Sequence, residues 1–261
     1  MKIYRGFDEL PQLNYTVATV GSFDGVHRGH IELLENLTTI AKLNGGESVV
    51  LTFEPHPRVV LGRSEGLNLL MSFDEKVRTL RRYGVENLVV IPFDKSFSRL
   101  SHSQFIKEYL VGKLNLRSLV VGYDHNMGCD SDGLYGDFVK LGEECGFDVS
   151  RVPECMDIGG MHISSTFIRN VIRRGEMERA AELLSRPYMI MGSVDNDGRV
   201  WFNEPLKLLP AAGIYMARIN MDCEAVVEVD SNGAIWLKGG FDRNHGDEKV
   251  TIELPKSRGV F

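Results

Sequence analysis

Two histidines, His27 and His30, lie three positions apart at the end of residues 16–30, TVATVGSFDGVHRGH. This segment starts as a β-rich run, stops at Gly21 and continues into a stretch with helical spacing of apolar residues. Backbone N–H groups and the positive end of a helix dipole converge at such a helix start. Gly29 has no Cβ, so a bulky anion can approach the backbone. The spacing therefore predicts a phosphate site built on a strand, a turn and a helix.

The glycines of this segment exclude the two commonest phosphate loops. A Walker A loop needs a lysine directly after its last glycine, and none follows Gly25 or Gly29. The dinucleotide fingerprint G-x-G-x-x-G does not fit glycines at positions 21, 25 and 29. H-x-G-H resembles the pattern of nucleotidylyl transferases, which move a nucleoside monophosphate from a triphosphate to an acceptor. The alternative for this pattern alone is a pair of surface histidines.

Two further polar loops each follow a strand-like run. The first is Pro55-His56-Pro57, where two prolines stiffen a loop that could form the wall for a flat ligand. The second runs from residue 122 to 128 and offers Asp124, which suits a ribose, a nucleotide or a metal-bound water, followed by Met127. Taken alone, the proline loop would be interpreted as an ordinary exit from a strand.

A run of three hydroxyls, Ser164, Ser165 and Thr166, precedes a helical pattern. One hydroxyl is enough to cap a helix, and an ordinary cap remains the alternative interpretation. Arg169, three residues beyond Thr166, adds a guanidinium suited to phosphate on the same helix face.

The sequence pattern around these segments predicts an α/β fold that would position them. Strand-like runs at 48–53, 87–92, 118–122 and 147–152 alternate with helical patterns at 31–43, 73–83, 101–110 and 137–145. Continuous Val, Leu and Ile in the strands favours a doubly wound parallel sheet, which binds ligands at the carboxyl ends of its strands. Beyond Arg186 the pattern changes to short alternating strands between glycine turns, typical of a small antiparallel β-barrel-like module. We therefore predict two domains, residues 1–186 and 187–261.

Composition limits the classes of partner. The 261 residues carry a net charge of −6, which argues against nucleic acid, and 43% hydrophobic residues, as in soluble globular proteins. The start of the chain lacks a signal-peptide pattern, and no apolar run is long enough to span a membrane. The four cysteines show no zinc spacing and are expected to be free thiols. We expect a cytoplasmic protein without a membrane partner; the oligomeric state does not follow from the sequence.

In this order the segments resemble the bacterial bifunctional riboflavin kinase/FAD synthetases, specifically their FMN adenylyltransferase module. The resemblance covers residues 15–190 and rests on five motifs. They are G-x-F-D-G-V-H-x-G-H at 21–30, T-F-x-P-H-P at 52–57, P-F-D at 92–94, V-G-x-[DN]-x-x-x-G at 121–128 and S-S-T-x-I-R at 164–169. Leu100-Ser101…Phe105 and the closing Leu184…Arg186-Pro187-Tyr188 also match. The resemblance implies a Rossmann-like nucleotidylyltransferase domain.

The chain departs from the family pattern in two places. At 126–132 the family usually carries aromatic and basic residues, whereas this chain has Asn126, Met127 and two aspartates. The family's kinase barrel contains G-x-P-T-A-N, whose Thr and Asn serve MgATP, and a later carboxylate base. Neither is found here, so we expect a reduced second module without riboflavin kinase activity.

The implied reaction is ATP + FMN → FAD + pyrophosphate, with Mg²⁺ accompanying ATP. The resemblance implies that His27, His30 and Arg169 are catalytic and that Pro55, His56, Pro57 and Met127 border the flavin. It implies nucleotide contacts for Gly21, Phe23, Asp24, Gly25, Gly29, Asp124, Ser164, Ser165 and Thr166. The partners would then be small molecules, ATP and FMN. The alternatives are a non-catalytic flavin or nucleotide binder, transfer to another phosphorylated acceptor, and a bifunctional enzyme with residual kinase activity.

Overall fold

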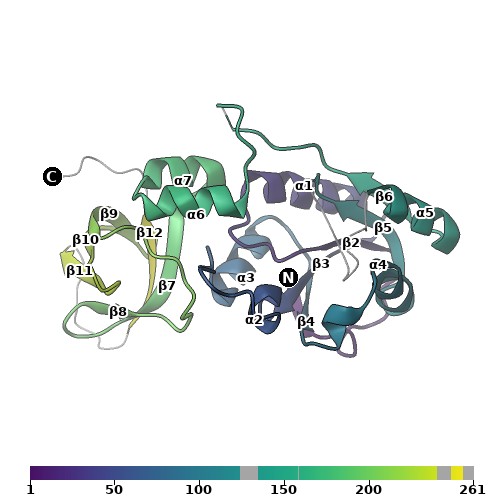
Figure 1. Cartoon of the computed structure of the whole chain (residues 1–261), viewed down its shortest axis with the longest axis horizontal. Helices are drawn as coiled ribbons and strands as arrows, with labels where there is room; N and C mark the ends of the chain where they lie inside the picture. The colour runs from purple at the N-terminus through teal and green to yellow at the C-terminus, as the bar shows by residue number, and fades with distance from the viewer. Residues whose placement is uncertain (124–134, 158, 240–247, 255–261) are drawn as a thin grey trace. The chain divides into compact units, whose positions relative to one another are not determined.

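The computed structural model describes residues 1–123, 135–157, 159–239 and 248–254, which form two compact units. The units interleave along the chain, because each is assembled from three segments. The first consists of Met1–Phe23, Gly29–Leu67 and Thr79–Cys155, and the second of Asp24–Arg28, Asn68–Arg78 and Met156–Phe261. The elements can be followed in Figure 1. A domain boundary after Arg186 remains a prediction.

The first unit is built on a six-stranded sheet in the order β1-β4-β3-β2-β5-β6, and every neighbouring pair is parallel. Its strands are β1 (Lys2–Arg5), β2 (Thr16–Val20), β3 (Glu47–Glu54), β4 (Asn87–Pro92), β5 (Leu116–Val121) and β6 (Asp148–Arg151). All five residues of β2 are buried, as expected for a strand covered on both faces. The predicted parallel α/β sheet is thus confirmed, and the edge strand β1 extends it.

Helices follow the strands in the alternation that the sequence predicts. They are α1 (Arg28–Leu43), α2 (Pro57–Val60), α3 (Phe73–Arg82), α4 (His102–Gln104) and α5 (Tyr135–Cys145), with a 3₁₀ turn at Phe97–Arg99 and a π-helical turn at Phe105–Val111. One core cluster packs alternate strand residues, such as Ala18 and Val20, against the π-helical turn and α5. The predicted helix 101–110 begins with a capping box at Ser101 and then widens into the π-helical turn.

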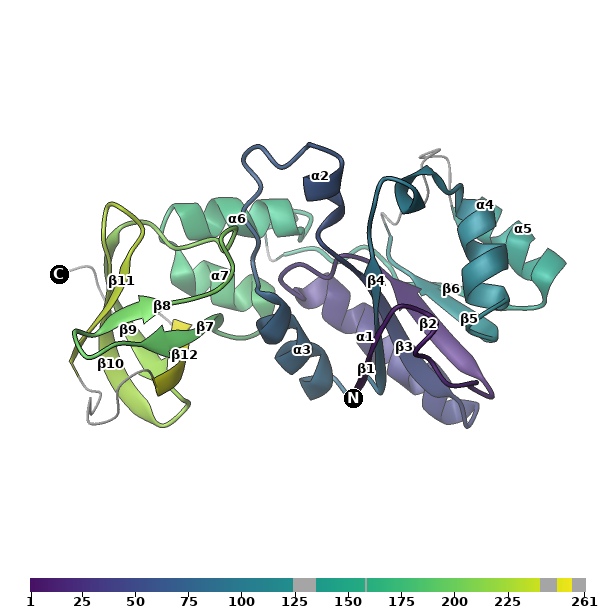
Figure 2. The same ribbon diagram turned by 90° about the horizontal axis from the view of Figure 1, so that it is seen from below.

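The second unit holds α6, α7, the first part of α3 and a closed six-stranded barrel in the order β10-β11-β8-β7-β12-β9, which Figure 2 shows from a second side. All its strand pairs are antiparallel, as predicted. The elements are α6 (Ser165–Arg173), α7 (Met177–Leu184), β7 (Tyr188–Val194), β8 (Arg199–Trp201), β9 (Gly213–Ile219), β10 (Cys223–Val229), β11 (Ile235–Gly239) and β12 (Glu248–Leu254). Among the described residues, no helix combines the length and the apolar character needed to cross a bilayer.

Candidate active site

The strand order of the first unit places a topological switch point between β2 and β5. From β2 the sheet continues through β3 and β4 on one side and through β5 and β6 on the other. Ligands of doubly wound sheets bind where this reversal leaves a crevice at the carboxyl ends of the strands. The chain leaves β2 at Gly21 and β5 at Gly122, so two of the motif segments start at this point.

The segment after β2 has an unusual backbone. Phe23, Gly25 and Val26 all have positive φ, at 48°, 89° and 38°. Position 25 favours glycine because of its φ of 89°, and a Cβ there would also lie 2.6 Å from Cδ1 of Leu70. Non-glycine residues rarely adopt this conformation, least of all a β-branched valine. The segment is therefore held in its shape by surrounding structure.

Within the second unit, Asp24 is the centre of a buried polar network. Its Oδ1 accepts hydrogen bonds from the backbone N–H groups of Leu70 at 2.8 Å and Met71 at 3.2 Å. Its Oδ2 forms an ion pair with Nη2 of Arg169 at 2.7 Å, and the two side chains are only 4% and 11% exposed. Nε of Arg169 also donates to the carbonyl of Asn68 at 2.7 Å. Asp24 and Arg169, both predicted as site residues, thus bond each other and backbone groups of the protein.

The three hydroxyls at the start of α6 have three different environments. Ser164 is the N-cap, and its Oγ accepts from the backbone N–H of Phe167 at 3.3 Å. The Oγ of Ser165 donates to the backbone carbonyl of Asp24 at 2.7 Å. Thr166 is exposed. The structure therefore brings Asp24, Ser165 and Arg169 together, which their sequence positions alone could not establish.

The two motif histidines differ in burial. His27 is 8% exposed and directly precedes α1. His30 lies in the first turn of α1, is partly exposed, and packs its ring 5.2 Å from the ring of the buried Phe23 at an interplanar angle of 54°. Gly29, between them, is also partly exposed. The helix start is therefore as predicted, but His27 precedes it rather than sharing its first turn.

The predicted flavin wall lies at the carboxyl end of β3. Pro55 is exposed, and Pro57 is the first residue of the short helix α2. His56 caps this helix, because its Nδ1 accepts from the N–H of Arg58 at 3.2 Å. Nearby, the ring centroids of Phe53 and Phe93 lie 5.3 Å apart. Asp124 and Met127, predicted for the nucleotide and the flavin, lie outside the described residues.

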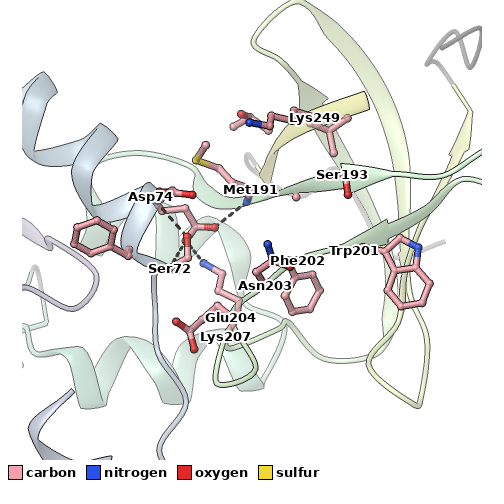
Figure 3. A pocket seen from close by; sticks show the side chains of 15 residues that line it. Ser72, Asp74, Met191, Ser193, Trp201, Phe202, Asn203, Glu204, Lys207 and Lys249 are labelled. Carbon is pink, nitrogen blue, oxygen red and sulfur yellow. Dashed lines mark hydrogen bonds and ion pairs between the residues drawn. The ribbon is translucent and has the colours of Figure 1, made fainter. Parts of the chain in front are cut away.

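A separate cavity of 410 Å³ lies in the second unit, and no predicted site residue lines it (Figure 3). One wall contains a buried ion pair between Nζ of Lys207 and Oε2 of Glu75 at 2.5 Å, with side chains 1% and 2% exposed. The same ammonium donates to the carbonyls of Leu70 and Met189, each at 2.8 Å. Burial lowers the pKa of Lys207, and the carboxylate of Glu75 opposes this effect. Among the described residues, no cluster of His, Cys, Asp and Glu could hold a metal ion.

Arg186 matches the family pattern as part of Arg186-Pro187-Tyr188, but sequence reasoning assigned it no role at the site. Its guanidinium donates to the backbone carbonyls of Gly25 and Val26, residues of the phosphate motif. The separation of about 160 positions gives no local signal, and only the side-chain contacts reveal the connection. Lys207 and Glu75, separated by 132 positions, were missed for the same reason.

A family model and several relatives match this chain, and they agree on one enzyme family. A family model described as FAD synthetase matches residues 10–167. A relative from Buchnera aphidicola (subspecies Schizaphis graminum) is 33% identical over 201 residues, which cover 77% of this chain and 64% of the relative. A relative from Escherichia coli K12 is 34% identical over 84% of this chain and 73% of its own length. One from Pseudomonas fluorescens is 32% identical, with 94% and 81% covered. All three are named bifunctional riboflavin kinase/FMN adenylyltransferase.

A solved structure has the same fold. It is a Streptococcus pneumoniae protein described as a macrolide-efflux protein, with a TM-score of 0.84 over 100% of this chain and 91% of the other. The two sequences are 23% identical, so this likeness speaks for the fold alone.

Proposed function

The chain belongs to the FAD synthetase family of nucleotidyltransferases, and from this premise we propose that it is an FMN adenylyltransferase. It transfers AMP from ATP to FMN, and the products are FAD and pyrophosphate. The observation that carries this proposal is the family match over residues 10–167, which includes the phosphate motif at the switch point of the sheet.

The proposed chemistry needs no general base. The nucleophile is the terminal phosphate of FMN, whose second pKa of about 6 leaves it mostly dianionic at neutral pH. The protein must instead bring two anions together and stabilise charge on the α-phosphoryl group and the leaving pyrophosphate. We assign this role to His27 and His30, supported by the N-terminus of α1.

The other site residues receive roles according to their contacts. We assign Thr166, which is exposed, to a phosphate oxygen, and Ser164 keeps its cap. The hydroxyl hydrogen of Ser165 goes to the carbonyl of Asp24, so Ser165 would donate to phosphate only by exchanging that partner. Arg169 bonds Asp24 and Asn68 through Nη2 and Nε and has further N–H donors for a phosphate oxygen. The phosphate turn is shaped by Gly21, Phe23, Gly25 and Gly29. The isoalloxazine is bordered by Pro55, His56 and Pro57. The predicted roles for nucleotide and flavin are kept for Asp124 and Met127, respectively.

Magnesium enters this proposal as part of the substrate MgATP rather than as a resident ion. Mg²⁺ prefers phosphate oxygens and water to an all-protein cage, so the triphosphate supplies most of its ligands. FMN, ATP and free Mg²⁺ occur together in the cytoplasm, which is where we propose that the enzyme acts.

We expect the purified protein to form FAD from FMN and MgATP, with one pyrophosphate released for each FAD. Chromatographic separation of FMN from FAD with fluorescence detection measures the product, and a coupled assay measures pyrophosphate. Reactions without protein and reactions with MgCTP are the controls. FMN and ATP that bind in a thermal-shift assay but yield no FAD would favour the alternative of a non-catalytic flavin binder.

Riboflavin and MgATP should give neither FMN nor FAD. Phosphorylation of the riboflavin 5′-hydroxyl needs a base, because this hydroxyl is not ionised at pH 7, together with a cradle for the ATP phosphates. The segment between Val194 and Leu208 has no P-T-A-N sequence. The same chromatographic assay tests this, with FMN as the positive substrate. FMN production from riboflavin at a rate comparable to FAD formation would show that the enzyme is bifunctional.

A further inference from the structure

Three successive backbone carbonyls of the phosphate motif accept hydrogen bonds from two side chains of the second unit. The carbonyl of Asp24 accepts from Oγ of Ser165 at 2.7 Å. The carbonyl of Gly25 accepts from Nη2 of Arg186 at 2.5 Å, and that of Val26 from Nη1 of Arg186 at 2.9 Å. One guanidinium therefore holds two consecutive peptide groups.

The held segment is one that would not keep its shape by itself. Val26 is fully buried and has φ of 38°, a conformation that a β-branched residue strongly disfavours. Gly25 next to it has φ of 89°. Such a backbone persists only where the surrounding structure determines it, and it is characteristic of ligand-binding turns.

Arg186 is itself held in place. It follows α7, which ends at Ser185 in the left-handed conformation, and the N–H of Arg186 donates to the carbonyl of Ala181 at 3.1 Å. Its Nη1 also donates to the carbonyl of Leu184 at 2.9 Å. The following Pro187 restricts the backbone further. A planar, fixed guanidinium fork is the group best suited to hold two acceptors at once.

Peptide geometry then determines where the N–H groups of the segment point. In a trans peptide the C=O and N–H groups point to opposite sides. The carbonyls of Gly25 and Val26 face Arg186, so the N–H groups of Val26 and His27 face away from it. Val26 is fully buried and His27 is 8% exposed, so His27 is the residue of the two that can meet a phosphate.

We propose that Arg186 is a positioning residue for the triphosphate of ATP. It does not touch the nucleotide; it fixes the peptide groups of Gly25 and Val26 so that His27, which follows them, is positioned for phosphate oxygens before ATP arrives. This inference rests on the proposed function, because it takes the phosphate motif as the ATP site.

The test compares Arg186→Ala, Arg186→Lys and the control Arg174→Ala. Arg174 follows α6, and its side chain is 55% exposed and pairs with Glu176. Arg174→Ala therefore also removes a guanidinium, but one at the surface. Titration calorimetry with MgATP and with pyrophosphate measures binding, and steady-state kinetics measure KM for ATP and for FMN separately. Thermal unfolding of each variant reports on the fold.

Arg186→Ala should weaken MgATP binding by about 10- to 100-fold, the range for charge-assisted hydrogen bonds that are lost. KM for FMN should stay unchanged, and Arg174→Ala should match the unaltered protein. Arg186→Lys should fall between the two, because an ammonium does not reproduce the fork. Millimolar guanidinium should restore part of the ATP affinity of Arg186→Ala.

Unchanged ATP affinity in Arg186→Ala would overturn the proposal, as would an equal loss for ATP and FMN with no rescue by guanidinium. If Arg186→Ala does not fold, the MgATP affinity of Arg186→Lys is the test: a loss supports the proposal, and an unchanged affinity overturns it. An unaltered protein that binds MgATP but forms no FAD would refute the proposed function and leave the titrations as a valid test of Arg186. An unaltered protein that binds no MgATP would overturn both.

Discussion

His30→Ala will lower kcat/KM for FAD formation by about 100-fold or more, the usual consequence of losing one preorganised donor at a developing charge. The partly exposed imidazole lies in the first turn of α1 and packs on Phe23. Its loss leaves the buried face of α1 intact, so thermal stability should change little. Steady-state kinetics with FMN and MgATP provide the measurement.

His102→Ala is the matched control for this variant. His102 is also in the first turn of a helix, α4, and its ring packs on an aromatic ring, that of Phe138, at 6.3 Å between centroids. His102 lies within the segment Leu100-Ser101…Phe105 but is not one of its matched positions and has no assigned role at the site, so its removal should leave kcat/KM unchanged. Near-normal turnover in His30→Ala would remove His30 from the reaction and leave His27 as the histidine assigned to the phosphates.

Lys207→Met will lower the free energy of unfolding of the second unit by about 3–5 kcal/mol, the range for a buried charge that loses its partner. Glu75 would be left as a carboxylate with a side chain only 2% exposed. Urea unfolding can be followed by tryptophan fluorescence. Both tryptophans of the chain, Trp201 and Trp236, belong to strands of the barrel.

Two further variants separate the pair from its surroundings. Lys249→Met removes an exposed ammonium from the wall of the same cavity and should change stability by less than about 1 kcal/mol. Lys207→Met combined with Glu75→Gln should recover much of the loss, because a neutral amide tolerates burial better than an unpaired carboxylate. A single variant Lys207→Met as stable as Lys249→Met would show that the buried pair contributes nothing to the barrel.

The sequence predicted the parts of the fold that local pattern controls. Continuous apolar runs located the central strands, and the predicted strand at 87–92 agrees with β4 at both ends. Gly25 was predicted as part of a phosphate turn, and its φ of 89° agrees with the conformation that only glycine adopts easily. β1 and β8 were not predicted, since strands of four and three residues are too short to show a period.

The site could be predicted only as a set of residue types. Asp24 and Arg169 were each expected to contact nucleotide, and no feature of the sequence showed that they bond each other across 145 positions. The two side chains pair because both are buried: a carboxylate and a guanidinium that are removed from water need partners. Which partner lies nearest depends on the tertiary fold. Arg186 is a further example, since its role depends on the direction of two distant carbonyls.

The interleaving of the two units limits how evolution or an engineer can exchange the barrel. Of the three acceptors that surround the ammonium of Lys207, the carboxylate of Glu75 and the carbonyl of Leu70 come from the segment Asn68–Arg78. Only the carbonyl of Met189 belongs to the barrel strands. A gene fusion joined at residue 187 would thus transfer a barrel in which the ammonium of Lys207 has lost its carboxylate partner and one of its two carbonyl acceptors. A transferable module must carry residues 68–78 as well, so recombination at a single crossover point cannot exchange it intact.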